Sequence, residues 1–171
     1  KKLSLSYFLS FDLPVKLVRP FNTYGPRQST RAIIPTIISQ VLSGNKSIKL
    51  GSLSPTRDLT FVKDTCMGFY EIFKSEHLLG EVTNIGMNNQ ISIGDLANKI
   101  FNLMESDAEI VSEDLRIRPE GSEVDRLHCC NKKILGNTSW SPDYDLDQGL
   151  QETIEWFKLS TKNYKSDIYN V

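Results

Sequence analysis

The sequence is poor in the residues that build metal centres and disulfide frameworks. It has three cysteines, Cys66, Cys129 and Cys130, and two histidines, His77 and His128. An odd number of cysteines, two of them adjacent, does not form a disulfide framework, and no pair has the C-x-x-C or H-x-x-x-H spacing of a metal site. We therefore expect no metal, free thiols in a reducing, cytoplasmic compartment, and packing roles for the adjacent cysteines.

The sequence also lacks an excess of either charge and a long apolar run. Its 20 lysines and arginines nearly balance 21 aspartates and glutamates, which argues against nucleic acid or a membrane surface as partner. No apolar run approaches the roughly 18 residues of a membrane-spanning helix, and no signal peptide is recognisable. At 171 residues the chain has the length of one domain with a real core. Any ligand or partner must therefore be recognised by a local group of residues and not by the overall charge of the chain.

Helix and strand patterns alternate along the chain, which predicts an α/β domain with a partly mixed sheet. The chain opens without an initiator methionine on a helical pattern, which we interpret as the last turns of a helix that begins upstream. Residues from about 160 onward are expected to form a loose tail. Helices are expected over about 1–11, from about 30 or 35 to 43, and over 64–80, 92–104, 131–135 and 145–160, and strands over 15–20, 47–50, 57–62, 81–85 and 108–111.

Local signals indicate where several of these helices start. Asp64 is the expected N-cap of the third helix, whose inner face we expect to carry Met67, Tyr70 and Phe73. Each of the two long helices after it is preceded by the pattern of a capping box, in which two polar side chains bond each other's backbone N–H groups. Asp145 begins the second of these patterns. The inner faces of these two helices are expected to carry, respectively, Leu96, Ile100, Leu103 and Met104, and Leu150, Ile154 and Phe157.

One stretch gathers polar side chains at the end of a strand. Residues 18–27 read V-R-P-F-N-T-Y-G-P-R. In open α/β sheets ligands bind beyond the carboxyl ends of the strands, so the chemistry of this chain should be sought there. The carboxamide of Asn22 suits such a place because it can both donate and accept hydrogen bonds.

This stretch and the later R-D-L-T-F-V-K-D at 57–64 resemble the NAD-dependent nucleotide-sugar epimerases and dehydratases of the extended short-chain dehydrogenase class. The blocks at 52–58, 83–86 and 117–120 are most similar to 4,6-dehydratases acting on UDP-N-acetylglucosamine or a similar nucleotide sugar. The resemblance covers nearly all of residues 1–171 but only the C-terminal half of the family. It implies that the chain is the C-terminal part of an extended short-chain dehydrogenase fold. This part would comprise the last Rossmann strands and a small α/β substrate-binding lobe, and the N-terminal NAD-binding half would be absent.

The resemblance implies roles for particular residues. Asn22 matches an asparagine that lies against the sugar nucleotide near its pyrophosphate. Arg57 and Arg118 match two arginines that hold the diphosphate, and a guanidinium fork suits phosphate oxygens. Each also has an ordinary explanation: Asn22 could cap the turn at 24–26, Arg57 could pair with a neighbouring aspartate, and Arg118 could be solvated.

Further candidates follow from the same resemblance. Asn84 matches an asparagine that helps to hold the nucleotide or sugar, although a turn-forming asparagine is an equally ordinary explanation. Leu50 and its two neighbours lie where the family places backbone against the nucleobase. Arg31 is a candidate neighbour of the phosphates or sugar. Pro20 and Phe21 are candidate contacts of the cofactor.

The residues that the family uses for hydride transfer are missing from this sequence. No G-x-x-G-x-x-G fingerprint for NAD is present, and the only Tyr-x-x-x-Lys string, Tyr70 to Lys74, lies too far downstream to match the family's pair. We therefore assign no catalytic residue and do not expect this chain to hold NAD alone. The resemblance implies that a complete enzyme, expected to be a homodimer, produces a 4-keto-6-deoxy sugar.

Two alternatives stay open. A sibling 4-epimerase or decarboxylase would share the same groove, and the chain could instead be a truncated, non-catalytic binding module. A UDP-sugar is the expected ligand, but siblings also use guanosine and deoxythymidine sugars, and contacts to the base are largely made by backbone.

Overall fold

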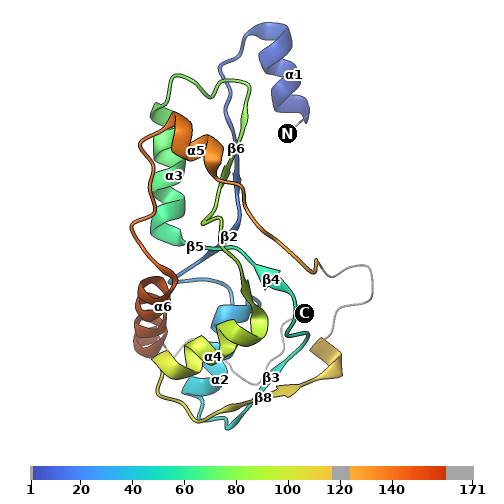
Figure 1. Cartoon of the computed structure of the whole chain (residues 1–171), viewed down its shortest axis with the longest axis vertical. Helices are drawn as coiled ribbons and strands as arrows, with labels where there is room; N and C mark the ends of the chain where they lie inside the picture. Colours follow the sequence, from blue (N-terminus) through green and yellow to red (C-terminus); the bar gives the residue numbers. More distant parts are fainter. Residues whose placement is uncertain (1, 117–123, 161–171) are drawn as a thin grey trace.

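The computed structural model describes residues 2–116 and 124–160, and Figure 1 shows it as an elongated α/β structure. Helices α1, α3 and α5 lie with strands β1 and β6 at one end, and α2, α4, β3 and β8 lie at the other. The elements in chain order are α1 Lys2–Phe11, β1 Leu17–Pro20, β2 Asn22–Tyr24, α2 Ile33–Leu42, β3 Ser47–Leu50, β4 Thr56–Arg57, β5 Leu59–Phe61, α3 Val62–Lys74, β6 Val82–Ile85, β7 Ile91–Ser92, α4 Ile93–Leu103, β8 Glu109–Ser112, the 3-10 helix η1 Asp114–Arg116, α5 Lys132–Asn137 and α6 Leu146–Ser160.

The described strands form four pairs. The pairs β1–β6, β2–β5 and β3–β8 are parallel, and β4–β7 is antiparallel. This arrangement confirms the predicted α/β class with both strand directions. Phe21 links β1 to β2 and donates its backbone N–H to the carbonyl of Ile85 at the end of β6, so the chain passes directly from the first pair into the second.

The main hydrophobic core lies where α2, α4 and α6 pack against β2, β3 and β5. The apolar residues of each helix recur every three or four positions, which places them on one face. The predicted inner faces of α4 and α6 are confirmed. Their fully buried members include Leu96 and Ile100 on α4 and Leu150, Ile154 and Phe157 on α6. Among the described residues, no helix is long and apolar enough to cross a bilayer.

The predicted capping box before α6 is confirmed, and before α4 the N-cap half of the pattern is confirmed, while the second bond joins the two side chains, from Ser92 Oγ to Asp95 Oδ2 at 2.6 Å. Ser92 Oγ accepts the backbone N–H of Asp95 at the start of α4. Before α6, Asp145 Oδ1 accepts the N–H of Gln148, and Gln148 Oε1 accepts the N–H of Asp145. These starts were predictable because both partners lie within four residues of each other.

The predicted start of α3 is wrong. The helix begins at Val62, and Asp64 lies inside its first turn with its side chain buried. Its carboxylate accepts the backbone N–H groups of Asp143, at 2.9 Å, and Tyr144, at 3.2 Å. Burial raises the pKa of this carboxyl, and the two hydrogen bonds oppose that rise. Asp64 thus fixes a distant segment of the chain and does not cap its own helix.

The predicted inner face of α3 is also wrong. Met67, Tyr70 and Phe73 are exposed, Phe73 to 78%. The helix instead turns Gly68 and Ile72 inward. A Cβ atom at Gly68 would lie 2.8 Å from the side chain of Ile85, so the helix approaches β6 too closely for a larger residue. The face of α3 that carries Gly68 is therefore the one that packs against β6.

Helix α1 adds to this exposed apolar surface. None of its residues is buried, and Figure 1 shows it at the end of the molecule beyond the β1–β6 pair. Leu3, Leu9 and Phe11 are each at least 70% exposed. Exposed apolar patches of this kind mark contact surfaces in native proteins.

The buried carboxylate of Asp58 joins three segments. Its oxygens accept the backbone N–H groups of Met87 at 2.8 Å, Asn89 at 3.2 Å and Cys129 at 3.0 Å. Asp58 separates β4 from β5, Met87 and Asn89 lie between β6 and β7, and Cys129 precedes α5. One side chain therefore holds both loops against the strand that carries Arg57.

We expect Asp58→Ala to lower the free energy of unfolding by roughly 3 kcal/mol or more, because three N–H donors lose a charged acceptor. Chemical denaturation monitored by circular dichroism measures the change. Asp107→Asn is the control, because Asp107 forms an exposed ion pair with Lys46 and should contribute less than about 1 kcal/mol. Equal effects of the two substitutions would contradict the role given to Asp58.

The adjacent cysteines have different environments. Cys129 is buried, whereas Cys130 and Cys66 are exposed. Burial raises the pKa of the Cys129 thiol to about 12, and the charge of Asp58 contributes to the rise. The predicted packing role is confirmed for Cys129 alone.

This difference predicts selective alkylation. With a pKa of about 12, roughly one Cys129 thiol in ten thousand is ionised at pH 8, and the thiolate is the reactive form. Iodoacetamide should therefore modify Cys130 at least about tenfold faster than Cys129 in the native protein, as measured by tandem mass spectrometry. The two rates should converge in denaturant; equal rates in the native protein would show that Cys129 is accessible.

Candidate functional site

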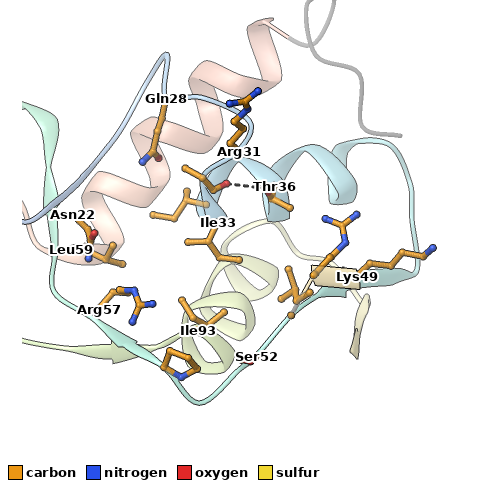
Figure 2. A pocket seen from close by; sticks show the side chains of 16 residues that line it. Asn22, Gln28, Arg31, Ile33, Thr36, Lys49, Ser52, Arg57, Leu59 and Ile93 are labelled. Atoms are coloured by element: carbon orange, nitrogen blue, oxygen red, sulfur yellow. Dashed lines mark hydrogen bonds between the residues drawn. The ribbon is translucent and has the colours of Figure 1, made fainter. Parts of the chain in front are cut away.

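A pocket of about 350 Å³ lies at the junction of the strands and the α2–α4 end of the structure. Its walls come from the start of β2, the loop before α2 and its first turn, the end of β3 with the loop after it, β4 and the residue Arg116 of η1. Figure 2 shows Asn22, Leu59 and Arg57 at one end and Lys49 at the other, with Ile33 between them.

The charged side chains that line the pocket all carry the same sign. They are Arg31, Lys49, Arg57 and Arg116, and no aspartate or glutamate is among the described lining residues. The chain as a whole has a net charge of −1, so the cations are concentrated locally. Such a site attracts anions, because neighbouring positive charges add their potentials in a partly enclosed space.

The rest of the lining is largely apolar. Ile33, Leu50, Pro55, Leu59 and Ile93 form the surface between the cations. Leu50 and Pro55 are buried, and Leu50 belongs to the main hydrophobic core. A pocket with apolar walls and a few placed polar groups suits a ligand with a flat or apolar part and an anionic part.

Two amides in the wall have unused hydrogen-bonding atoms. Asn22 Nδ2 and Gln28 Oε1 are buried and have no hydrogen-bond partner among the described residues. Gln28 Nε2 donates to the carbonyl of Thr23 at 3.0 Å, which fixes the orientation of that amide. Buried polar atoms are normally paired in folded proteins, so these two atoms point to a polar ligand.

Arg57 is placed by backbone contacts. Its Nη1 donates to the carbonyl of Thr56 at 2.9 Å and to that of Val124 at 2.6 Å. Figure 2 shows its guanidinium reaching into the pocket from β4. Arg31 lies opposite, on the loop that leads into α2, and its side chain is exposed.

The backbone N–H and carbonyl of Lys49, on the edge of β3 at the pocket, are already hydrogen-bonded. The buried amide of Gln40 on α2 accepts the backbone N–H of Lys49 at 3.0 Å and donates to the carbonyl of Lys49 at 3.3 Å. A ligand therefore meets the side chain of Lys49 and not its peptide groups. No local sequence pattern predicts this contact, because Gln40 and Lys49 lie on different elements.

The structure brings four of the predicted site residues together. Asn22, Arg31, Leu50 and Arg57 all line the pocket. Arg118 falls outside the described residues.

Three other predicted site residues lie elsewhere. Asn84 lies on β6, where its Nδ2 donates to the carbonyl of Cys130 at 3.4 Å and its Oδ1 is buried without a partner among the described residues. Pro20 and Phe21 lie at the end of β1 and do not line the pocket. Their predicted roles toward a ligand or cofactor stay predictions.

Sequence reasoning missed Gln28 and Arg116 as pocket residues. Gln28 directly follows the G-P-R turn, and its position in that motif was the available signal. Arg116 lies in a charge-rich segment without apolar periodicity, in which the sequence could not distinguish a pocket arginine from a solvated one. Among the described residues, no group of three His, Cys, Asp or Glu side chains is placed to bind a metal ion.

Comparisons with known proteins identify the family of this chain. The family model described as GDP-mannose 4,6 dehydratase matches residues 1–153. The chain is 30% identical over 166 residues to the dTDP-D-glucose 4,6-dehydratase of Homo sapiens, covering 94% of this chain and 46% of that protein. It is 33% identical over 161 residues to the UDP-N-acetyl-alpha-D-glucosaminuronate decarboxylase of Bacillus cytotoxicus, covering 91% and 50% respectively.

Solved structures share the fold. The UDP-glucuronic acid 4-epimerase of Bacillus cereus, in complex with UDP-glucuronic acid and NAD, matches with a TM-score of 0.83 and 25% identity over 93% of this chain and 50% of that one. This similarity confirms the fold class that the sequence predicts. The chain spans about half the length of the relatives it matches.

Proposed function

The chain belongs to the family of GDP-mannose 4,6-dehydratase and related NAD-dependent nucleotide-sugar epimerases and dehydratases, and we propose that it is the nucleotide-sugar-binding part of such an enzyme. The observation that carries this proposal is the pocket itself. Four cationic side chains, no described carboxylate and an apolar surface between them suit a nucleoside diphosphate, which joins a flat base to two phosphates. The volume of about 350 Å³ is adequate for most of such a ligand.

We propose that the ligand binds in one orientation along the pocket. Its diphosphate lies near Arg57 and Arg31, because guanidinium groups form paired hydrogen bonds to phosphate oxygens. Its base and ribose lie over Leu50 and the neighbouring apolar surface, toward Lys49. The sugar then lies beyond Asn22, at the carboxyl end of β1, where Asn84 would approach it.

The residues of this chain do not fit NAD by themselves. No glycine-rich strand-to-helix turn is present in the sequence, and Tyr70 and Lys74 lie on the exposed side of α3, remote from the pocket. We therefore derive no hydride-transfer step from this chain. We propose that NAD is bound by another part of the complete enzyme and that Pro20 and Phe21 border it.

The exposed apolar side chains of α1 and α3 indicate where that other part docks. Within residues 2–116 and 124–160, the parallel pair β1–β6 has only two strands, whereas parallel strands are normally buried in larger sheets with both faces covered. We propose that the NAD-binding half extends this pair and covers Met67, Tyr70 and Phe73. The resemblance further suggests that the complete enzyme is a homodimer.

The proposed reaction is 4,6-dehydration of a nucleotide sugar to the 4-keto-6-deoxy product. The sequence blocks around Arg57 and Asn84 support it, as does the similarity to a dehydratase. Decarboxylation is the second candidate, because a decarboxylase is similar at 33% identity; a truncated, non-catalytic module is the third.

Product analysis of the native polypeptide that carries this chain separates these candidates. With NAD and UDP-N-acetylglucosamine, we expect a product that has lost one water, detected by mass spectrometry. A product of unchanged mass would indicate an epimerase. Loss of carbon dioxide from a UDP-uronic acid would indicate a decarboxylase, and no turnover of any tested nucleotide sugar would leave only the binding role.

Binding of UDP, GDP and dTDP to the native polypeptide tests the pocket directly. We expect Arg57→Ala to weaken the preferred nucleotide by about ten- to hundredfold, because hydrogen bonds to charged groups contribute about 1.5–3 kcal/mol. Isothermal titration calorimetry measures the affinity. Lys133→Ala is the control, because it removes the same charge from an exposed ion pair with Glu81, outside the pocket. Unchanged affinity in Arg57→Ala would contradict the proposed site.

A further inference from the structure

The side chain of Gln28 is held at one end of its amide and unused at the other. Gln28 lines the pocket, and its Oε1 is buried without a hydrogen-bond partner among the described residues. Its Nε2 donates to the carbonyl of Thr23 at 3.0 Å. Because a carbonyl oxygen only accepts, the amide cannot turn over without losing this bond. Gln28 therefore presents a hydrogen-bond acceptor of fixed position to the pocket.

The local backbone directs Gln28 back toward β2. Its backbone N–H donates to the carbonyl of Gly25 at 3.3 Å, which closes a turn over residues 25–28. Arg27, inside this turn, has a φ of 66°, a left-handed conformation that residues other than glycine adopt rarely. Such strained residues persist only where surrounding contacts hold them, and they concentrate at functional sites. The turn brings the amide of Gln28 to the strand that carries Asn22, and Figure 2 shows both side chains in the wall of the pocket.

The chemistry of the proposed ligand decides which of its parts can use this acceptor. Four cations line the pocket, yet none of them bonds Gln28 Oε1. Phosphate oxygens bind guanidinium groups as acceptors, and those of a sugar-linked diphosphate carry no hydrogen at neutral pH. The diphosphate therefore cannot satisfy a second acceptor. The missing donor must be a hydroxyl or N–H group in another part of the ligand.

The position of Gln28 favours the sugar over the base. In the proposed orientation the base lies toward Lys49 and the sugar lies beyond Asn22. Thr23, which holds the amide of Gln28, directly follows Asn22 on β2, whereas Lys49 lies at the opposite end of the pocket (Figure 2). Asn22 Nδ2 is also buried without a partner among the described residues. A donor and an acceptor at one end of the pocket suit hydroxyl and amide groups, because each of these can both donate and accept.

We propose that Gln28 determines specificity for the sugar, because its Oε1 accepts a hydrogen bond from a hydroxyl or N–H group of the hexose. The inference rests on the proposed function. A hexose without this donor leaves a buried acceptor unpaired, and sites built to pair such groups reject ligands that cannot do so. Gln28 thus distinguishes sugars by the position of one donor and contributes little to the affinity for the nucleotide alone.

The first test compares two ligands of the native polypeptide, without added NAD, so that the sugar is not converted. They are whichever of UDP, GDP and dTDP binds most tightly and its N-acetylglucosamine conjugate. We expect Gln28→Met, which keeps the length but removes the amide, to weaken binding of the conjugate about three- to tenfold. Affinity for the nucleotide alone should change less than about twofold, as measured by isothermal titration calorimetry. Equal losses for the two ligands, or an unchanged affinity for the conjugate, would overturn the proposal.

A second test changes the ligand and leaves the protein intact. Analogues of the conjugate carry hydrogen in place of one hydroxyl group, or of the acetamido group, of the hexose. We expect at least one analogue to bind about three- to tenfold more weakly. Fluorine at the same position should not restore binding, because it cannot donate a hydrogen bond. The same replacement should cause no further loss in Gln28→Met, because both changes remove one contact. Additive losses at every position, or full affinity for every analogue, would contradict the contact.

Controls separate this inference from the proposed function. Gln151→Met removes an amide that bonds Glu155 on α6, outside the pocket lining, and should leave both affinities unchanged. Failure of the unmodified protein to bind any nucleotide would overturn both proposals. Nucleotide binding that depends on Arg57, together with conjugate binding that does not depend on Gln28, would overturn this inference alone. Thermal unfolding shows whether each variant is folded, and the ligand analogues give a result even if Gln28→Met is not.

Discussion

The buried carboxylate of Asp58 is the contact on which the geometry of the site depends. It accepts backbone N–H groups from residues that follow it by 29 to 71 positions, and so it joins the strands to the loop before β7 and to the segment before α5. Arg57 directly precedes it. A buried carboxylate with three hydrogen bonds keeps the surrounding backbone in one arrangement. The backbone from which the Arg57 side chain extends into the pocket is therefore held in place.

Local and overall charge differ in this chain. The total is nearly balanced, yet the described residues that line the pocket carry four positive charges and no negative one. Glu113 lies just behind the lining and binds two of these cations.

Buried and exposed apolar residues also lie in different parts of the molecule. A buried hydrophobic core lies around α2, α4 and α6, whereas apolar side chains on α1 and α3 are exposed. The chain spans about half the length of the relatives it matches.

Much of the fold was predictable because the relevant signals are short. The capping box before α6, the N-cap Ser92 of α4 and the apolar faces of both helices depend on residues within one or two turns, and these are confirmed. In the site, the motif around Asn22 and the R-D pair at 57–58 indicated two pocket residues, Asn22 and Arg57. Gln28 was missed although it directly follows the G-P-R turn, and Arg116 was missed because nothing next to it in the sequence distinguishes a pocket arginine from a solvated one.

The sequence by itself determined the α/β class, the helices with regular apolar spacing and the polar strand end, because each depends on neighbouring residues. Tertiary structure decided the rest. Asp64 bonds a segment 79 positions away and does not cap its helix, and α3 turns Gly68 inward because β6 lies so close. Gln40 reaches the peptide of Lys49 only because α2 packs beside β3. Such contacts join residues far apart in the chain, and local patterns carry no information about them.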